Sequence, residues 1–199
     1  MKHLPNALTL ARLVLSILMF VALAVVGALQ APPEWAPALI WFSVAAFFIA
    51  AITDFFDGWL ARRWQAASLM GAILDPIADK ILVCGAILGL MAVHARDMAI
   101  AGGVILFREF AVSALREVLA PMGLKLPVTF LAKTKTTVQL VALGVLMIIW
   151  FWPVWGIPAS FEQMRTIYQT ASLAFDAAAA LTVWTGVEYA MAARRLLRK

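Results

Sequence analysis

Four aspartates lie close together in an otherwise strongly apolar chain, within the segment DFFDGWLARRWQAASLMGAILDPIAD (54–79). Asp54 and Asp57 are three residues apart. Asp75 and Asp79 are four residues apart, so each pair lies on one face of a helix. Four carboxylates that meet repel one another, and divalent cations relieve that repulsion. Because oxygen-only ligation is typical of Mg²⁺ or Mn²⁺, the sequence predicts two such ions held by these aspartates.

Two metal ions held by carboxylates are suited to phosphoryl transfer, because they neutralise phosphate oxygens and stabilise the attacking and leaving groups. An aspartate that stays partly free can take the proton of an alcohol as a general base. A plainer interpretation makes Asp75 a helix N-cap before Pro76 and pairs the first two aspartates with neighbouring arginines. We favour a functional site because the four acids occur together beside apolar runs, where charge is costly.

The elements that must hold these acids are membrane helices. The chain has 199 residues, of which 64% are hydrophobic and 14% charged, and its mean hydropathy is +0.93. Since about 20 apolar residues span a bilayer, we expect an all-α integral membrane protein with six transmembrane helices. A short N-terminal juxtamembrane segment would precede them, and the whole chain (1–199) would form one domain. The apolar runs are 13–29, 36–53, 81–93, 98–119, 138–152 and 171–191.

The third run is long enough to span only if the acidic stretch before it is also helical. A short reversal through RRWQAASLM (62–70) then joins the second and third helices. We therefore expect these two helices to be antiparallel neighbours, so that all four carboxylates can converge.

Lysine and arginine are distributed unevenly between the predicted connections, and this predicts the orientation of the chain. One side collects Lys2, Arg62, Arg63, Lys80, Arg116, Lys125, Lys133, Lys135, Arg194, Arg195, Arg198 and Lys199. The other side holds only Arg96 and Arg165. Because positive charge favours the cytoplasmic side, we expect both termini and the aspartate site at the cytoplasmic membrane surface. The net charge of +5 then reflects orientation, and no nucleic-acid partner is expected.

The acidic segment resembles the signature of the CDP-alcohol phosphatidyltransferases, D-x2-D-G-x2-A-R-x8-G-x3-D-x3-D, at all eight fixed positions. The resemblance implies a metal-dependent membrane enzyme that transfers a phosphatidyl group from CDP-diacylglycerol to an alcohol and releases CMP. It also implies a homodimer and a reaction without a covalent enzyme intermediate. All four aspartates would bind the metals, and Asp79 would also be the general base.

The resemblance further implies a CDP pocket built from two parts of the chain. One part is the signature itself, through Asp57, Gly58, Ala61, Arg62 and Gly71. The other is PNALTLAR (5–12), through Asn6, Thr9 and Arg12, which recur every three residues along the first helix. For Asn6 and Thr9, helix capping at the membrane surface is an equally good interpretation. Arg12 is costly to leave unpaired near lipid, which favours a functional role.

Three stretches resemble bacterial members of the family that act on sn-glycerol 3-phosphate. They are PNALTLAR (5–12), REFAVSALRE (108–117) and KTKTT (133–137). They imply a phosphatidylglycerophosphate product and a location in the bacterial inner membrane. The acceptor's phosphate would bind to Arg108, Arg116, Lys133 and Lys135. Backbone amides at a helix start near the two lysines would help, whereas membrane anchoring of these lysines is the alternative. Glu109 is expected to pair with Arg116.

Other functions remain open on the sequence alone. Another acceptor, such as inositol phosphate or phosphatidylglycerol, would use the same aspartates. A divalent-metal transporter would use them as its ion site, but such sites usually lie near the middle of the bilayer, between repeated halves. The sequence shows no internal repeat, so we favour the transferase.

Overall fold

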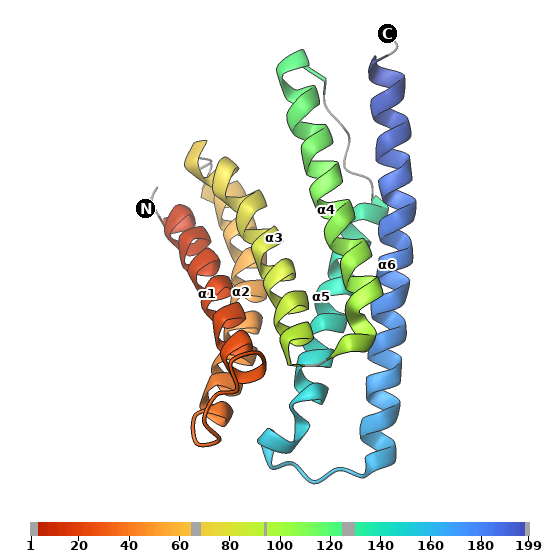
Figure 1. Cartoon of the computed structure of the whole chain (residues 1–199). Helices are drawn as coiled ribbons and strands as arrows, with labels where there is room; N and C mark the ends of the chain where they lie inside the picture. Colours follow the sequence, from red (N-terminus) through yellow and green to blue (C-terminus); the bar gives the residue numbers. More distant parts are fainter. Residues whose placement is uncertain (1–3, 65–68, 94, 125–129, 198–199) are drawn as a thin grey trace. The chain divides into compact units, whose positions relative to one another are not determined.

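A computed structural model of the protein describes residues 4–64, 69–93, 95–124 and 130–197. Within these ranges it describes all side chains except those of residues 4–5, 55–64, 69, 72, 96, 130 and 132–133. This part of the chain forms six α-helices and three short 3₁₀ helices, and no β-strand (Figure 1), which confirms the all-α prediction. The elements are α1 (Leu4–Gly27), α2 (Ala36–Trp64), α3 (Leu69–Ala92), η1 (Arg96–Met98), α4 (Ala99–Leu119), η2 (Ala120–Met122), α5 (Phe130–Trp150), η3 (Trp152–Trp155) and α6 (Phe161–Leu197).

Several helices are compatible with a membrane protein. Among the described residues, three are long and apolar enough to cross a bilayer, at Asn6–Gly27, Ala36–Asp54 and Phe161–Leu197, and a shorter apolar helix covers Thr134–Trp150. The expected juxtamembrane segment is continuous with α1, which begins at Leu4. Helix α6 has 37 residues, or about 55 Å, so it exceeds the roughly 30 Å hydrocarbon core. Six crossing helices stay a prediction.

The chain divides into two compact units, which we describe separately. The first comprises Met1–Arg96 and Met147–Ala159, and the second comprises Asp97–Leu146 and Ser160–Lys199. The single domain expected over residues 1–199 stays a prediction.

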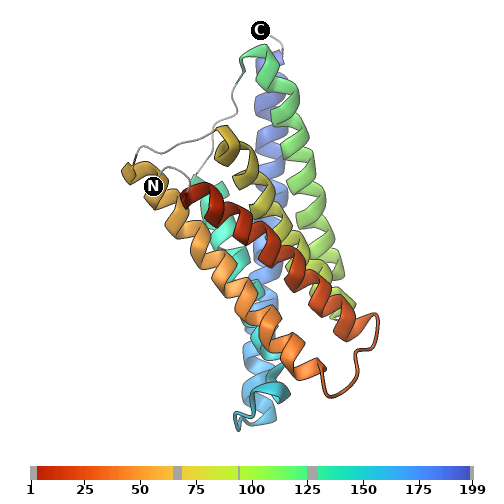
Figure 2. The ribbon, with the colours of Figure 1, turned by 90° about the vertical axis from the view of Figure 1, so that its left-hand side faces the viewer.

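In the first unit, α1 packs along both α2 and α3, whereas the described parts of α2 and α3 contact each other little (Figures 1 and 2). Helices α2 and α3 run antiparallel, as predicted, and α1 lies against both of them. Glycines allow this packing. A Cβ added at Gly27 would lie 2.2 Å from the carbonyl oxygen of Ala92, and one at Gly89 would lie 2.5 Å from Leu23 Cδ1.

Helix α3 begins at Leu69, before the aspartates, so Pro76 lies inside the helix. Asp75 is therefore not an N-cap, and the capping interpretation of this residue is wrong. Proline has no N–H group and leaves one helical hydrogen bond unmade, which the rest of a 24-residue helix tolerates. The helical acidic stretch also gives α3 the length that the apolar run 81–93 lacked.

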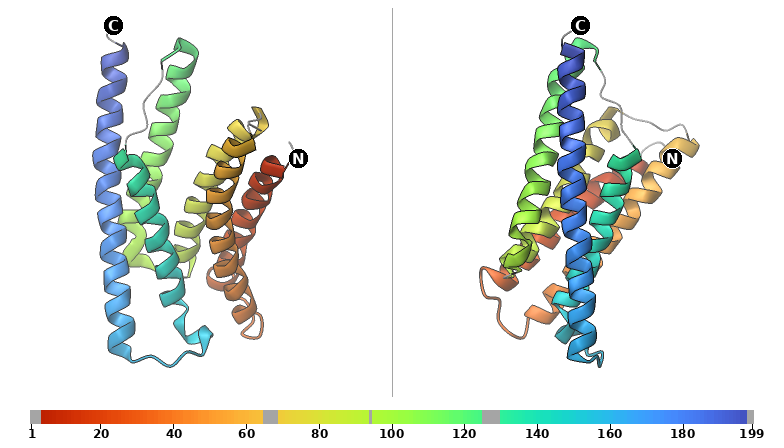
Figure 3. Two further views of the ribbon diagram at one scale, coloured as in Figure 1. Left: turned by 180° about the vertical axis from the view of Figure 1, so that it is seen from behind. Right: turned by 90° about the vertical axis from the view of Figure 1, so that its right-hand side faces the viewer.

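In the second unit, α4 and α6 lie side by side, and α5 runs antiparallel to α6 (Figure 3). Two hydrogen bonds, from Arg108 to Thr185 and from Arg116 to Tyr189, show that α4 and α6 run in the same direction. Beyond these polar contacts, Val112 and Leu119 of α4 pack with Tyr189 and Ala193 of α6 in a buried apolar cluster. This packing holds the arginines of α4 against α6.

Candidate functional site

The first unit contains a cluster in which Arg12 of α1 contacts aspartates from two other helices. Its Nη1 atom forms ion pairs with Asp54 of α2 and with Asp79 of α3, the latter at 2.6 Å. Its Nη2 atom lies 3.6 Å from Asp75 Oδ1. The Arg12 side chain is fully buried, whereas the three aspartate side chains are 41%, 49% and 52% exposed, in sequence order. A buried guanidinium requires counter-charges, and these acids provide them.

Thr9, one turn before Arg12, joins the same cluster. Its hydroxyl donates a hydrogen bond to Asp75 Oδ1 at 2.7 Å, and its side chain is buried. Because α1 begins at Leu4, Thr9 is not a helix cap and that alternative is wrong. Asn6 is half-buried on the same helix, and Gly71 is buried on α3. Their predicted roles in binding CDP stay predictions.

Five of the predicted site residues lie outside the described side chains. They are Asp57, Gly58, Ala61, Arg62 and Lys133. The backbone of the first four belongs to α2, and that of Lys133 belongs to α5. Their predicted roles stay predictions.

The donor set of this cluster fits a hard divalent cation. Three partly exposed carboxylates meet around one positive group, and carboxylate oxygens are the ligands that Mg²⁺ and Mn²⁺ prefer. Among the described side chains, no group of three or more His, Cys, Asp or Glu residues is arranged to hold a metal. Arg12 Nη1 instead donates to oxygens of Asp54 and Asp79, and Asp57, the fourth predicted ligand, lies outside the described side chains. A bound ion would compete with Arg12 for those oxygens.

The second unit holds a separate charged cluster built from α4, α5 and α6. Arg108 Nη1 lies 3.2 Å from Glu109 Oε1, and Arg108 Nη2 donates to Thr185 Oγ1 at 3.0 Å. Lys135 Nζ pairs with the same oxygen of Glu109, and the Lys135 side chain is only 2% exposed. One carboxylate therefore joins a cation of α4 to a cation of α5.

Arg116 joins this cluster through Tyr189 of α6. Its Nη2 atom donates to the tyrosine hydroxyl at 3.1 Å, and its guanidinium carbon lies 5.2 Å from the ring centroid. The guanidinium carbon of Arg108 lies 5.3 Å from the same centroid. The structure thus corrects the expected pairing of Glu109 with Arg116, because Glu109 contacts Arg108 and Lys135 instead. Tyr189 was not among the residues predicted from sequence, although a tyrosine within the apolar run 171–191 was a signal for it.

Lys135 differs from its predicted setting. Helix α5 begins at Phe130, so Lys135 lies in the second turn, beyond the free amides of the helix start. Its ammonium group is buried and paired with Glu109, which also rules out the alternative that it extends to lipid headgroups. The three described cations predicted to bind phosphate, Arg108, Arg116 and Lys135, are all brought into one network.

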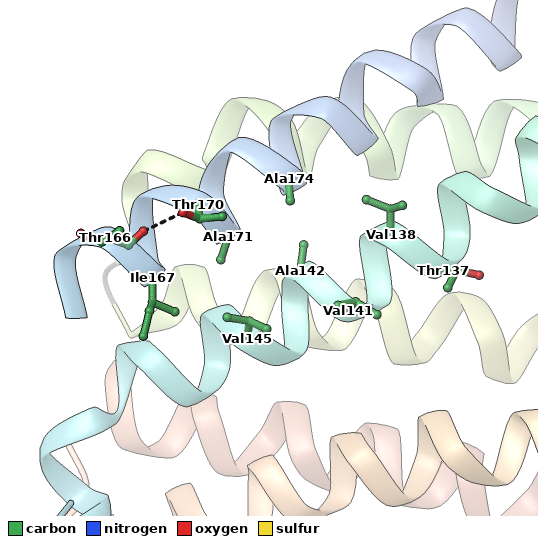
Figure 4. Close-up of a pocket in the computed structure, with 10 residues that line it drawn as sticks. All are labelled: Thr137, Val138, Val141, Ala142, Val145, Thr166, Ile167, Thr170, Ala171 and Ala174. Atoms are coloured by element: carbon green, nitrogen blue, oxygen red, sulfur yellow. Dashed lines mark hydrogen bonds between the residues drawn. The ribbon is translucent and has the colours of Figure 1, made fainter. Parts of the chain in front are cut away.

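A groove with a volume of about 450 Å³ lies between α5 and α6 in the second unit (Figure 4). It is lined by Thr137, Val138, Val141, Ala142, Val145, Thr166, Ile167, Thr170, Ala171 and Ala174. The hydroxyls of Thr166 and Thr170 donate to carbonyl oxygens of their own helix, at 2.9 and 2.8 Å. The groove therefore presents mainly methyl and methylene groups, which suit a hydrocarbon chain.

Comparison with known proteins assigns the chain to a family. The family model of the CDP-alcohol phosphatidyltransferases matches residues 2–184. The chain belongs to this family. A CDP-alcohol phosphatidyltransferase of Salmonella typhimurium strain LT2 is 38% identical over 195 residues, which cover 96% of this chain and 95% of the relative. Another, from Escherichia coli strain K12, is 37% identical over 196 residues, with the same coverage.

Both relatives carry the name CDP-diacylglycerol–glycerol-3-phosphate 3-phosphatidyltransferase. The family predicted from the eight-position signature is thus confirmed. In this CDP-alcohol phosphatidyltransferase, the described aspartates of the signature gather around an arginine from outside it, on α1.

Proposed function

We propose that this chain is a phosphatidylglycerophosphate synthase, which transfers the phosphatidyl group of CDP-diacylglycerol to sn-glycerol 3-phosphate and releases CMP. The observation that carries the proposal is the meeting of Asp54, Asp75 and Asp79 around one buried cation. A site that concentrates carboxylates beside a fixed positive charge suits the transfer of a charged phosphorus group. The names and the near-complete coverage of the two relatives support glycerol 3-phosphate as the acceptor.

The reaction would be one in-line displacement at the phosphorus that bears the diacylglycerol. The 1-hydroxyl oxygen of glycerol 3-phosphate forms the new bond to phosphorus, the bond from phosphorus to the CMP oxygen breaks, and the hydroxyl proton passes to Asp79. The Asp79 side chain is 52% exposed, so a substrate hydroxyl can reach it, while Arg12 fixes its position. Two Mg²⁺ or Mn²⁺ ions held by the four aspartates would neutralise the phosphate oxygens.

The second unit would supply the site for the acceptor's phosphate. Arg108, Arg116 and Lys135 lie in one network, and arginine binds phosphate through two parallel hydrogen bonds. A set of cations favours a phosphorylated acceptor over serine. Lys133 stays a predicted fourth member.

We place the chain in a bacterial inner membrane, with six crossing helices, both termini in the cytoplasm and the aspartates at the cytoplasmic surface. The apolar helices and the excess of Lys and Arg on one side support this arrangement. A homodimer remains part of the proposal through the family resemblance alone.

The groove between α5 and α6 would hold one acyl chain of the lipid substrate. Ala174 lies across the groove from Ala142, so Ala174→Phe should fill it (Figure 4). Excluding two methylene groups would lower kcat/KM for a long-chain CDP-diacylglycerol about tenfold. A short-chain analogue should lose much less. Ala180→Phe, at an exposed position of α6, is the matched control, and an equal loss with both chain lengths would contradict the assignment.

The proposed function is tested by CMP release from purified protein in detergent with CDP-diacylglycerol and Mg²⁺. Glycerol 3-phosphate, inositol phosphate, serine and phosphatidylglycerol would each be offered as acceptor. Of the four acceptors, we expect only glycerol 3-phosphate to support CMP release. A chelator should abolish this release, and excess Mg²⁺ should restore it. Release with another acceptor would contradict the proposed substrate, and release that persists under chelation would contradict the metal site.

A further inference from the structure

The cations of the second unit are held by two side chains to which the proposed reaction gives no role. We propose that Glu109 and Tyr189 are positioning residues, which assemble the cations into one preformed site for the acceptor's phosphate. This inference rests on the proposed function and extends it. The cations concerned are Arg108, Arg116 and Lys135.

Glu109 acts as the link between two helices. A single oxygen, Oε1, accepts from Lys135 Nζ on α5 and lies 3.2 Å from Arg108 Nη1 on α4. Lys135 is almost fully buried, and a buried ammonium without a counter-charge is costly. Without Glu109, Lys135 would either lose its proton or turn away, and in both cases the site loses one of its cations.

Tyr189 makes the corresponding link between the two arginines of α4. They are eight residues apart, about 12 Å along the helix, yet both guanidinium carbons lie within 5.3 Å of the tyrosine ring centroid. The tyrosine is 4% exposed and packs in the apolar cluster with Val112 and Leu119, so its ring is fixed. A rigid ring that attracts both guanidinium groups restricts their motion before binding, so these side chains lose less conformational entropy when they bind a ligand.

The assembled cluster has the charge and the spare donors that a phosphate requires. Three cations and one carboxylate leave two net positive charges, and a phosphate monoester carries about −1.5 to −2 charges at pH 7. Arg108 Nε is buried and has no hydrogen-bond partner among the described residues. Space for the Arg108 side chain comes from Gly186, where an added Cβ would lie 3.1 Å from Arg108 Cγ.

The test uses the full-length protein in detergent and compares variants that remove one link at a time. Glu109→Gln removes the charge, and Glu117→Gln removes the same charge from an exposed position of the same helix as a control. Tyr189→Phe removes only the hydroxyl that Arg116 contacts, and Tyr168→Phe alters the other tyrosine of the chain. Each protein is titrated with glycerol 3-phosphate, and separately with inorganic phosphate, while the midpoint of thermal unfolding is recorded. Initial rates then give KM for each substrate and kcat.

We expect Glu109→Gln to weaken glycerol 3-phosphate binding and raise its KM about tenfold or more. Tyr189→Phe should weaken binding about fivefold, since the ring remains. For both, KM for CDP-diacylglycerol should change less than about twofold, and Glu109→Asp should restore part of the lost affinity. Both controls should keep the unaltered protein's affinity for glycerol 3-phosphate, and only Tyr168→Phe should shift the unfolding midpoint, because it removes a hydrogen bond to Asp97.

Two results would overturn the inference. Equal or tighter glycerol 3-phosphate binding by Glu109→Gln would mean that the carboxylate competes with phosphate instead of positioning its cations. A lower unfolding midpoint with unchanged affinity would show a purely structural role. Should CMP release reveal another acceptor, the proposed function fails, but the inorganic phosphate titration of the same variants still decides whether Glu109 and Tyr189 position the cations.

Discussion

Asp79→Asn should lower the rate of CMP release by about 10²–10⁴-fold, the range that a general base contributes. Asparagine has nearly the same shape but cannot accept the proton of the acceptor's hydroxyl group. Its amide oxygen can still accept from Arg12 Nη1, which lies 2.6 Å from Asp79 Oδ1, so the cluster should stay assembled. Measured binding of CDP-diacylglycerol should therefore change little, and the loss should appear in kcat.

Asp176→Asn is the matched control for this prediction, because it makes the same change at an exposed position of α6. It should leave kcat unchanged. Near-normal turnover by Asp79→Asn would show that another group takes the proton. A loss of CDP-diacylglycerol binding equal to the loss of turnover would instead make Asp79 chiefly a ligand for the metal-bound nucleotide.

Arg12→Gln should destabilise the protein in the absence of divalent metal and lower activity about tenfold to a hundredfold, the range for losing hydrogen bonds to charged groups. The substitution leaves the carboxylates of Asp54, Asp75 and Asp79 facing one another without their common counter-charge. Water partly screens these half-exposed groups, so we expect the midpoint of thermal unfolding to fall by only about 4 °C. The loss should be largest at low ionic strength.

Added Mg²⁺ separates this interpretation from a simple packing defect. Because a divalent cation and the guanidinium compete for the same oxygens, Mg²⁺ should raise the unfolding midpoint of Arg12→Gln more than that of the unaltered protein. Arg165→Gln, which removes an exposed arginine of α6, should show neither effect. An equal response of both proteins to Mg²⁺ would contradict metal binding at the carboxylates that Arg12 contacts.

Much of this protein was predictable from sequence because the information is local. Spacings of three and four residues place Asp54 with Asp57, and Asp75 with Asp79, on single helix faces whatever the rest of the chain does. The eight-position signature lies in one continuous segment, and it identified the family. Apolar composition likewise predicted an all-helical chain, because helices satisfy their own backbone hydrogen bonds.

The partners of these residues depend on tertiary structure. Arg12 meets Asp54 from 42 residues away, and Arg108 meets Thr185 from 77 residues away. Helices that are apolar on all sides carry no pattern that tells which face meets which neighbour. Only the tertiary structure therefore decided how the helices pair. Close packing at small residues set the contacts of α1 with α2 and α3, and it also set the groove between α5 and α6. The need of each buried charge for a partner placed Glu109 between Arg108 and Lys135.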